Sequence, residues 1–369
     1  MKQKWKLNVK DLRISKKQMV LWMGGILAAV ILLMVFIVKV EPPAEGISRA
    51  EAAKALALVF EDPQTLEEMA SERENSAFAE KERENWFVKY MDYLYEKGYL
   101  DDKVTPASLT SAQGNLTYED VNAIAQKLSP ALKKQVGMTR WNKKKTFSKN
   151  SWWDLYKDIV KENDKEGNLK EVSAVLFGTP SNMEQAESWT AYTTEGVFGF
   201  QGLALDAYMD CEIRFWVRDQ EIAGMTQIAD DKPVYKNIWI SDVEKDQFTV
   251  YIGKYTRTFT AEGKLASQAE KKNEELKSCV ADLHMENGKL KKITVKKERV
   301  RGKVLAVTDD FIELEGYGCV PLDDNFHVYK VYGDFQVLGK GSILVGYDLQ
   351  EFVAAEGKVC GAILEQPLD

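Results

Sequence analysis

The feature that most constrains this chain is an uncharged, apolar segment near its start. No charged residue lies between Lys17 and Lys39, and Met19 to Val38 supply 20 mostly apolar residues. At about 1.5 Å per residue, a helix of this length is about 30 Å long, which matches the hydrocarbon core of a bilayer. The segment therefore predicts a transmembrane helix over residues 19–40.

The residues around this segment predict its orientation. The preceding tail, residues 1–18, carries seven basic residues and the single acid Asp11, whereas Glu41 and Glu45 follow the segment. By the positive-inside rule, the N-terminus is cytoplasmic and the C-terminal bulk extracellular. A cleaved signal peptide is the alternative, but it has an apolar core of about 7–15 residues and a small-x-small cleavage site. We therefore expect a single-pass protein of the cell membrane.

Composition bounds the remaining chain. Of 369 residues, 45% are apolar and 29% are charged, which is typical of a globular protein. The net charge of −7 argues against a dedicated nucleic-acid binder. The cysteines are widely spaced and have apolar or small neighbours, so we expect free, buried thiols, with a Cys319–Cys360 bridge as an open alternative. The four are Cys211, Cys279, Cys319 and Cys360.

The first half of the chain after the apolar segment has a helical pattern. Residues 41–46 are a proline-containing linker, and residues 47–130 are predicted to form a helical domain. Three helix starts carry a hydroxyl residue with an acid three residues later, which satisfies free amide groups and favours the helix dipole. These starts are Ser48…Glu51, Thr117…Asp120 and Ser151…Asp154.

The second half changes to the period of two that is typical of β-strands. A basic segment and helical connector occupy residues 131–190, followed by a first β module at 191–262 and a second at 263–369. Asn287-Gly288 between alternating apolar runs is a strong hairpin signal. The expected fold class is α+β: one transmembrane helix, a helical domain, and one or two small antiparallel β-barrel or sandwich modules.

The helical half resembles a known family. ENWFVKYMDYLYEKGYLDD, a loop and LTYEDVNAIAQKL together look like one degenerate S-layer homology unit, and ISRAEAAKALALVF looks like the closing helix of a preceding unit. The resemblance implies binding to anionic secondary wall polymers, with the second-helix arginine among the binding groups. Arg49, beside Glu51, is that arginine, whereas the later copy has Tyr118 in its place. Helices that merely pack on one another are the alternative.

A basic segment follows. Residues 133–149 contain seven basic residues and no acid, and Trp141 lies among them. Basic residues near an anionic surface contribute about 1 kcal/mol each, so Lys143, Lys144, Lys145 and Trp141 join Arg49 and Glu51 as predicted wall-polymer-binding residues. A solvated loop is the alternative explanation.

The β half carries a second resemblance. Three stretches are similar to the non-catalytic region of clostridial stage II sporulation protein D / amidase-enhancer (LytB-like) proteins. They are VLFGTPSN, TTEGVFGFQGLALDAYMD and the run ending VCGAILEQPLD. That family's peptidoglycan-cleaving domain is expected to begin about where this sequence stops. No catalytic acid of the family can be assigned to a residue of this chain.

The sequence offers no motif for catalysis. His284 and His327 have no partners at a metal-ligand spacing, and no HExxH, GxSxG or Walker A pattern occurs. We expect no cofactor and no enzymatic activity. The predicted function is a membrane-anchored, extracytoplasmic binding or scaffold protein of the cell wall, linked to peptidoglycan remodelling or sporulation. Its expected partners are the membrane, a wall polymer or peptidoglycan, and a protein of wall remodelling. A peptidoglycan hydrolase whose catalytic domain is missing or separately encoded, and an interaction subunit of a membrane complex, are the alternatives.

Overall fold

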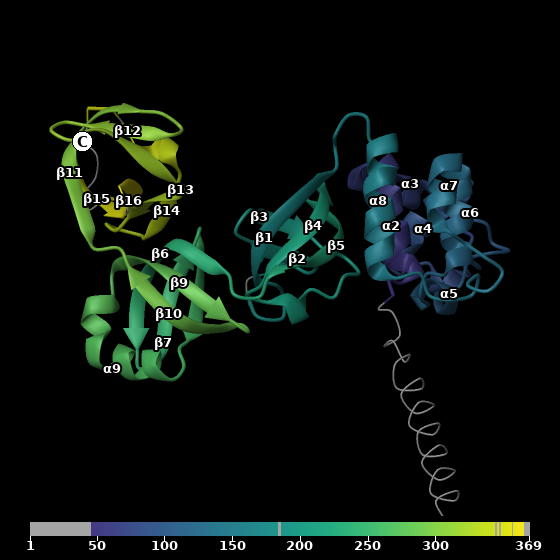
Figure 1. The fold of residues 1–369 in the computed structure, drawn as a ribbon, viewed down its shortest axis with the longest axis horizontal. Helices are drawn as coiled ribbons and strands as arrows, with labels where there is room; N and C mark the ends of the chain where they lie inside the picture. Colours follow the sequence, from purple (N-terminus) through teal and green to yellow (C-terminus); the bar gives the residue numbers. More distant parts are fainter. Residues whose placement is uncertain (1–45, 184–185, 344, 347, 356, 365–369) are drawn as a thin grey trace, which may run out of the picture.

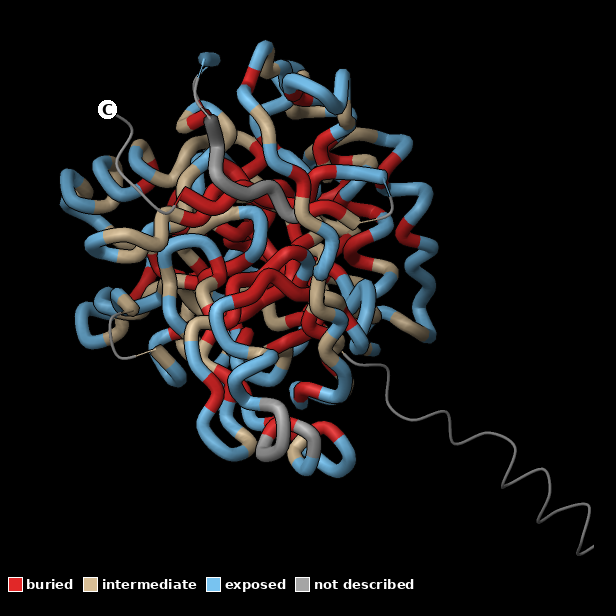
Figure 2. Tube along the Cα trace, turned by 90° about the vertical axis from the view of Figure 1, so that its left-hand side faces the viewer, coloured by how far each residue is buried: buried red, intermediate tan, exposed pale blue. Residues whose placement is uncertain are grey.

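A helical domain is followed by three β modules. The computed structural model describes residues 46–183, 186–343, 345–346, 348–355 and 357–364. Figure 1 shows the first β module between the helices and the other two β modules. Buried residues run through the interior of the molecule, and exposed residues gather at turns and outer helix faces (Figure 2).

The structure corrects the predicted membrane topology. No helix within the described ranges is long and apolar enough to cross a bilayer. The helix α8 (Lys149–Asn163) has 15 residues, about 22 Å against a hydrocarbon core of about 30 Å. The predicted span at residues 19–40, the tail at 1–18 and most of the linker lie outside the described residues. For the described residues the predicted fold class is therefore corrected to α+β without a membrane-spanning helix, and these residues give no support for a single-pass location in the cell membrane.

The helical domain, residues 46–169, surrounds one apolar core. Side chains from several helices meet there, and Leu56, Met91 and Trp152 are fully buried. The elements are α2 (Arg49–Phe60), α3 (Pro63–Glu72), η2 (Glu80–Glu82), α4 (Val88–Glu96), α5 (Leu109–Gln113), α6 (Tyr118–Leu128), α7 (Pro130–Val136) and α8.

The helix α8 belongs to this core and not to a separate connector. The Tyr156 hydroxyl of α8 donates a hydrogen bond to the Ala55 carbonyl of α2 at 2.9 Å, and both groups are buried. The domain therefore continues past residue 130, where the sequence placed its end. The reason is that the apolar face of α8 is needed to cover α2.

Two of the three predicted helix starts are confirmed. Ser48 and Thr117 each cap a helix in a capping box with the acid three residues later. The third start is wrong by three residues, because Ser148 caps α8 and its Oγ accepts the Ser151 N–H at 3.1 Å. Ser151 is thus the third residue of the helix and not its cap.

The first barrel, residues 170–230, is a closed ring of five strands. The order around the ring is β1-β2-β3-β5-β4. Every neighbouring pair is antiparallel except β3 and β5, which are parallel. The elements are β1 (Lys170–Gly178), β2 (Thr190–Thr193), β3 (Gly196–Gly199), η3 (Asp206–Tyr208), β4 (Glu212–Arg218) and β5 (Glu221–Asp230).

The second barrel, residues 234–295, repeats this order. Its sheet runs β10-β9-β6-β7-β8, and a parallel bridge between Ala261 and Leu290 links its two edges. The predicted Asn287-Gly288 hairpin is confirmed, with both residues at positive φ. The elements are β6 (Val234–Glu244), β7 (Gln247–Ile252), β8 (Tyr255–Thr260), α9 (Lys264–Leu276), β9 (Cys279–Glu286) and β10 (Lys289–Val295).

The third barrel, residues 298–364, repeats the order again. Its sheet runs β12-β11-β15-β16-β13-β14, and pairing between β12 and β13 closes a five-stranded ring from which β14 projects. The β13–β16 pair is parallel. The elements are β11 (Glu298–Val307), β12 (Phe311–Leu314), β13 (Gly318–Lys330), β14 (Gln336–Leu338), η4 (Lys340–Ser342), β15 (Asp348–Ala355) and β16 (Lys358–Leu364).

The described β region is thus one topology used three times. In each barrel a three-stranded meander is followed by a hairpin, the fourth strand pairs with the first, and the fifth lies parallel to the third. This is the five-stranded Greek-key barrel of the OB-fold. The predicted modules at 191–262 and 263–369 differ from these boundaries, because β1 precedes residue 191 and the second barrel continues past 262.

Buried polar contacts join the helical domain to the first barrel. Lys54 of α2 is fully buried and forms an ion pair with Glu221 of β5, and its Nζ also donates to the Gln201 carbonyl at 2.8 Å. Arg218 of β4 donates to the Leu58 carbonyl in the last turn of α2 at 2.9 Å. A cation at a helix C-terminus is favoured by the helix dipole.

A triad of two buried residues and one half-buried arginine joins the first barrel to the second. Asp210, which precedes β4, binds the guanidinium of Arg257 of β8 through both oxygens, with Nη2 to Oδ2 at 2.6 Å. The Tyr235 hydroxyl of β6 donates to the same carboxylate at 2.7 Å. Such bidentate pairs fix geometry as well as contributing energy.

Asn237 of β6 joins the second barrel to the third. It is buried at a φ of 54°, its Nδ2 donates to the Asp323 carboxylate and the Asn325 carbonyl at 3.0 Å each, and its own carbonyl accepts from the Tyr329 hydroxyl. The Trp239 and Tyr329 rings pack beside this contact, with centroids 5.4 Å apart.

The Lys54–Glu221 pair predicts a pH-dependent stability. Burial is the largest effect and lowers the pKa of Lys54 to about 8, against the raising effect of Glu221. Glu221→Gln leaves the ammonium buried without its partner, so we expect a loss of about 3–5 kcal/mol at pH 7. The pKa of Lys54 is lower in the folded state than in the unfolded state. Between about pH 8 and 10.5 the unfolded state therefore binds the proton that the folded state has lost, and the free energy of unfolding rises with pH. The loss is therefore expected to shrink at pH 9.

Urea unfolding at pH 7 and pH 9 measures both effects. The double variant Lys54→Met/Glu221→Gln is the control, because it removes both charges together and is expected to be about as stable as the native chain. Equal stability of Glu221→Gln and the native protein at pH 7 contradicts a role for the pair at this junction.

Candidate functional site

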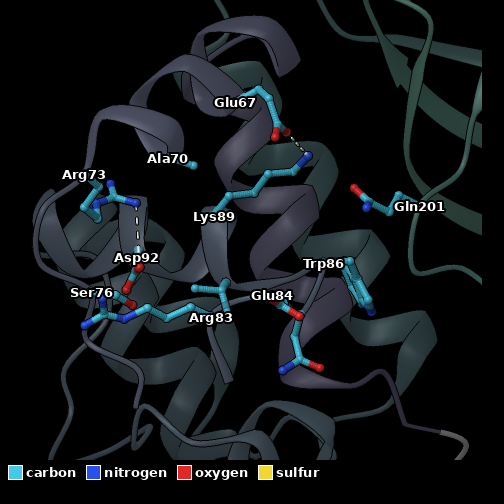
Figure 3. Close-up of a pocket in the computed structure, with 12 residues that line it drawn as sticks. Glu67, Ala70, Arg73, Ser76, Arg83, Glu84, Trp86, Lys89, Asp92 and Gln201 are labelled. Atoms are coloured by element: carbon cyan, nitrogen blue, oxygen red, sulfur yellow. Dashed lines mark hydrogen bonds and ion pairs between the residues drawn. The ribbon is translucent and has the colours of Figure 1, made fainter. Parts of the chain in front are cut away.

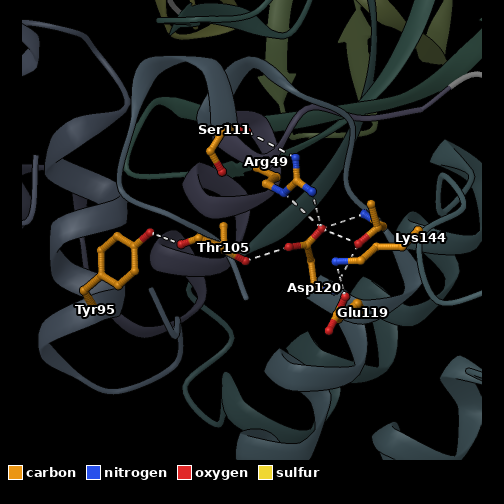
Figure 4. A network of polar contacts seen from close by, with 8 residues as sticks. Arg49, Tyr95, Thr105, Ser111, Glu119, Asp120 and Lys144 are labelled. Carbon is orange, nitrogen blue, oxygen red and sulfur yellow. Dashed lines mark hydrogen bonds and ion pairs between the residues drawn. The ribbon is translucent and has the colours of Figure 1, made fainter. Parts of the chain in front are cut away.

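The predicted binding residue Arg49 lies in a structural network (Figure 4). Its Nε and Nη2 contact the buried Asp120 carboxylate of α6 at 2.9 and 2.8 Å, and Nη1 donates to the Ser111 carbonyl at 3.3 Å. Asp120 also accepts from the Thr105 hydroxyl at 2.7 Å and from the Thr117 N–H at 2.8 Å. The guanidinium thus holds α2, α5 and α6 together.

Glu51 also has a local structural contact. Its Oε2 accepts hydrogen bonds from the Ser48 N–H at 3.0 Å and the Ser48 hydroxyl at 2.8 Å. These bonds complete the capping box of α2, so the Glu51 carboxylate is used at the helix start. Glu51 lines a small cavity together with Lys149 of the basic segment, and Arg49 is not part of that lining.

The four predicted residues of the basic segment are all exposed, and two of them pair with an acid. Lys143 and Lys144 each contact Glu119 of α6, at 2.6 and 2.7 Å, and these hydrogen bonds lower the pKa of the Glu119 carboxyl. Lys145 is exposed. Trp141 is 75% exposed, with the Arg140 guanidinium 4.2 Å from its ring centre. The segment is a loop whose two central lysines tie it to α6.

Cysteine and histidine chemistry is limited in the described chain. The four cysteines are free, Cys319 is exposed, and the other three are buried, which raises the pKa of their thiols. No group of three or more His, Cys, Asp or Glu side chains with metal-binding geometry occurs among the described residues.

A pocket of about 300 Å³ lies where the helical domain meets the first barrel (Figure 3). We call it the seam pocket. Figure 3 shows Arg73, Arg83 and Ser76 grouped near Asp92 on one side, and Trp86 and Gln201 on the other. The full lining is Glu67, Ala70, Arg73, Ser76, Arg83, Glu84, Asn85, Trp86, Val88, Lys89, Asp92 and Gln201.

Most charges of the seam pocket are already paired. Lys89 contacts Glu67 at 2.6 Å, and Arg73 lies between Asp92 at 3.7 Å and Glu96 at 2.9 Å. The guanidinium of Arg83 has no hydrogen bond or ion pair with any described residue, and the side chain is exposed. Arg83 is therefore a free cationic donor at the pocket, while Glu84 is an acid at the exposed rim.

The indole of Trp86 is held in place by the first barrel. Gly202 has a φ of +82°, and a Cβ there would lie 2.3 Å from the Trp86 ring, so only glycine permits this contact. Trp86 also packs edge-on against Phe87 and Tyr90. The pocket could not be predicted from the sequence, because Gln201 and Gly202 are far from Trp86 along the chain. The one sequence signal for the pocket is Trp86, an aromatic residue that stands just before α4.

The Arg49–Asp120 network predicts a large difference between neighbouring charges. Asp120→Asn removes the buried carboxylate that pairs with the half-buried Arg49, so we expect a loss of about 3–5 kcal/mol in the free energy of unfolding. Removing Lys143 and Lys144 together breaks only surface pairs, which are worth about 0–1 kcal/mol each. Urea unfolding measures both, with the exposed Asp154→Asn as control. Equal losses in the two variants contradict the structural role of Asp120.

Comparison with known proteins adds no assignment. No protein-family model matches the chain, and no curated protein matches it significantly. The resemblances to S-layer homology units and to LytB-like proteins stay predictions. The predicted keywords of transmembrane helix, cell wall and sporulation find no support in the described structure or in these comparisons. Function is therefore argued from the geometry of the site alone.

Proposed function

We propose that this protein is a non-catalytic scaffold that binds an oligosaccharide carrying a carboxylate in the seam pocket. The observation that carries the proposal is a pocket lined on one side by the guanidinium of Arg83, which has no partner among the described residues, and on the other by the indole of Trp86, which Gly202 holds in position. The proposal keeps the binding and scaffold part of the predicted function and leaves out the membrane anchor.

The side chains of the pocket suit a sugar. The indole of Trp86 offers an apolar face with a polar edge. Asn85 and Gln201 line the same pocket, and amide side chains both donate and accept hydrogen bonds, as sugar hydroxyls require. The volume of about 300 Å³ is at the lower end for small-ligand pockets.

Arg83 supports an acidic ligand. Lys89 and Arg73 are already neutralised by acids of the same pocket, so neither needs an external anion. A guanidinium binds a carboxylate through two parallel hydrogen bonds, which are stronger than bonds between neutral groups. Arg83, which has no partner within the described part of the chain, is therefore the group that would select a carboxylate.

The scaffold part rests on the junctions between modules. Polar contacts cross each module boundary, and they are made by Lys54, Arg218, Asp210 and Asn237. These contacts hold the modules in fixed relative positions. OB-type barrels commonly carry oligosaccharide sites, although that analogy concerns the fold and not this site.

Two disaccharides test the proposal. The peptidoglycan disaccharide of N-acetylglucosamine and N-acetylmuramic acid has a lactyl carboxylate that N,N′-diacetylchitobiose lacks. We expect Arg83→Gln to weaken binding of the acidic disaccharide roughly tenfold, since a hydrogen bond to a charged group contributes about 1.5 kcal/mol. Binding of chitobiose is expected to be unchanged. Isothermal titration calorimetry measures both affinities.

Two further variants complete this test. Gln201→Ala is expected to weaken both disaccharides equally, because the amide contacts hydroxyl groups that the two ligands share. Arg140→Gln is the matched control, an exposed arginine outside the pocket, and is expected to change neither affinity. The absence of binding by either sugar to the native protein contradicts the proposed function.

A further inference from the structure

A second cavity lies where the three barrels meet. It has a volume of about 720 Å³, and we call it the junction groove. The first barrel contributes β1, the β2–β3 turn and Glu212; the second contributes the start of β6 and the β7–β8 turn; the third contributes Asp324, Asn325 and His327. The groove exists only because the junctions hold the barrels in place.

The floor of the junction groove is apolar. Val175, Phe177, Ile238 and Ile252 line it and are buried. Tyr255 is half-buried, and its ring centroid lies 6.1 Å from that of Phe177. Because the four floor side chains are already buried, the apolar surface that a ligand can cover comes mainly from the half-buried Val197 and Tyr255.

The rim of the junction groove is predominantly acidic. The lining side chains include three acids, Glu195, Glu212 and Asp324, and one basic residue, Lys236. Burial lowers the pKa of His327, so this imidazole is neutral at pH 7. The rim therefore has a net charge of about −2 at neutral pH.

Several rim groups have no internal partner in the described structure. Glu195, Lys236 and Asp324 are exposed and make no side-chain hydrogen bond or ion pair with a described residue. Glu212 accepts from the Ser173 hydroxyl at 2.7 Å, which leaves its second oxygen available. These carboxylates are thus free to accept hydrogen bonds from a ligand ammonium group.

We propose that the junction groove binds an extended peptide in which apolar side chains alternate with lysines. In an extended chain successive side chains point to opposite faces, so apolar side chains contact the floor while lysines reach the acidic rim. Tyr255 adds an aromatic ring, which attracts an ammonium group over its face. A polyamine has the charge but lacks the apolar side chains that the floor favours.

This site is independent of the seam pocket. The two cavities share no lining residue, and their proposed ligands have opposite charge at the contacting group. Loss of sugar binding therefore leaves this proposal intact, and loss of peptide binding leaves the proposed function intact.

The experiment uses the full chain and a blocked pentapeptide with alternating leucine and lysine. The double variant Glu195→Gln/Asp324→Asn changes two exposed side chains, so its fold is expected to be intact. We expect it to weaken peptide binding at least about fivefold, as solvent-exposed charge pairs contribute modestly. A peptide with glutamine in place of lysine is expected to bind the native chain as weakly as the lysine peptide binds the double variant.

A matched control and a second measurement locate the binding. Glu244→Gln/Asp309→Asn makes the same chemical changes at exposed positions outside the groove, and it is expected to bind the peptide like the native chain. Methyl NMR signals of Ile238 and Ile252 are expected to shift on peptide addition, while that of Ile124 in the helical domain does not. Equal weakening in both double variants, or unshifted Ile238 and Ile252 signals, overturns the proposal.

Discussion

The arrangement of this molecule depends on charged and polar groups buried between its modules. At the junction of the first two barrels, Asp210 accepts from Arg257 and Tyr235 at once, so the carboxylate, the guanidinium and the hydroxyl all have partners. A buried charge without a partner is costly, whereas a fully paired one fixes a single geometry. Both cavities described above take their shape from such junctions, because each is lined by residues of more than one module.

Local features of the fold could be predicted from the sequence. The capping boxes at Ser48 and Thr117 and the Asn287-Gly288 hairpin are set by neighbouring residues, and the structure confirms all three. The threefold repeat of the barrel could not be predicted in this way. Its defining pairing joins the third and fifth strands, as in β13 with β16, and residues so distant along the chain share no local pattern.

The candidate site was harder to predict for the same reason. The resemblance to S-layer homology units predicted Arg49 as a binding residue, but its partner Asp120 lies 71 residues away. Only the folded chain shows that Arg49 is paired and that the Arg83 guanidinium has no partner among the described residues. A sequence reveals which residues carry charge, whereas burial and pairing decide which charges remain available to a ligand.

The unbroken series of junctions has a consequence for avidity. The seam pocket and the junction groove both border the first barrel, so the spacing between them is set by one rigid body and not by a flexible tether. A bipartite ligand whose own linker matches that spacing would gain a high effective concentration for its second contact. A ligand with a mismatched linker would gain no effective concentration. The distance across the first barrel would therefore select bipartite ligands by the length of their linker.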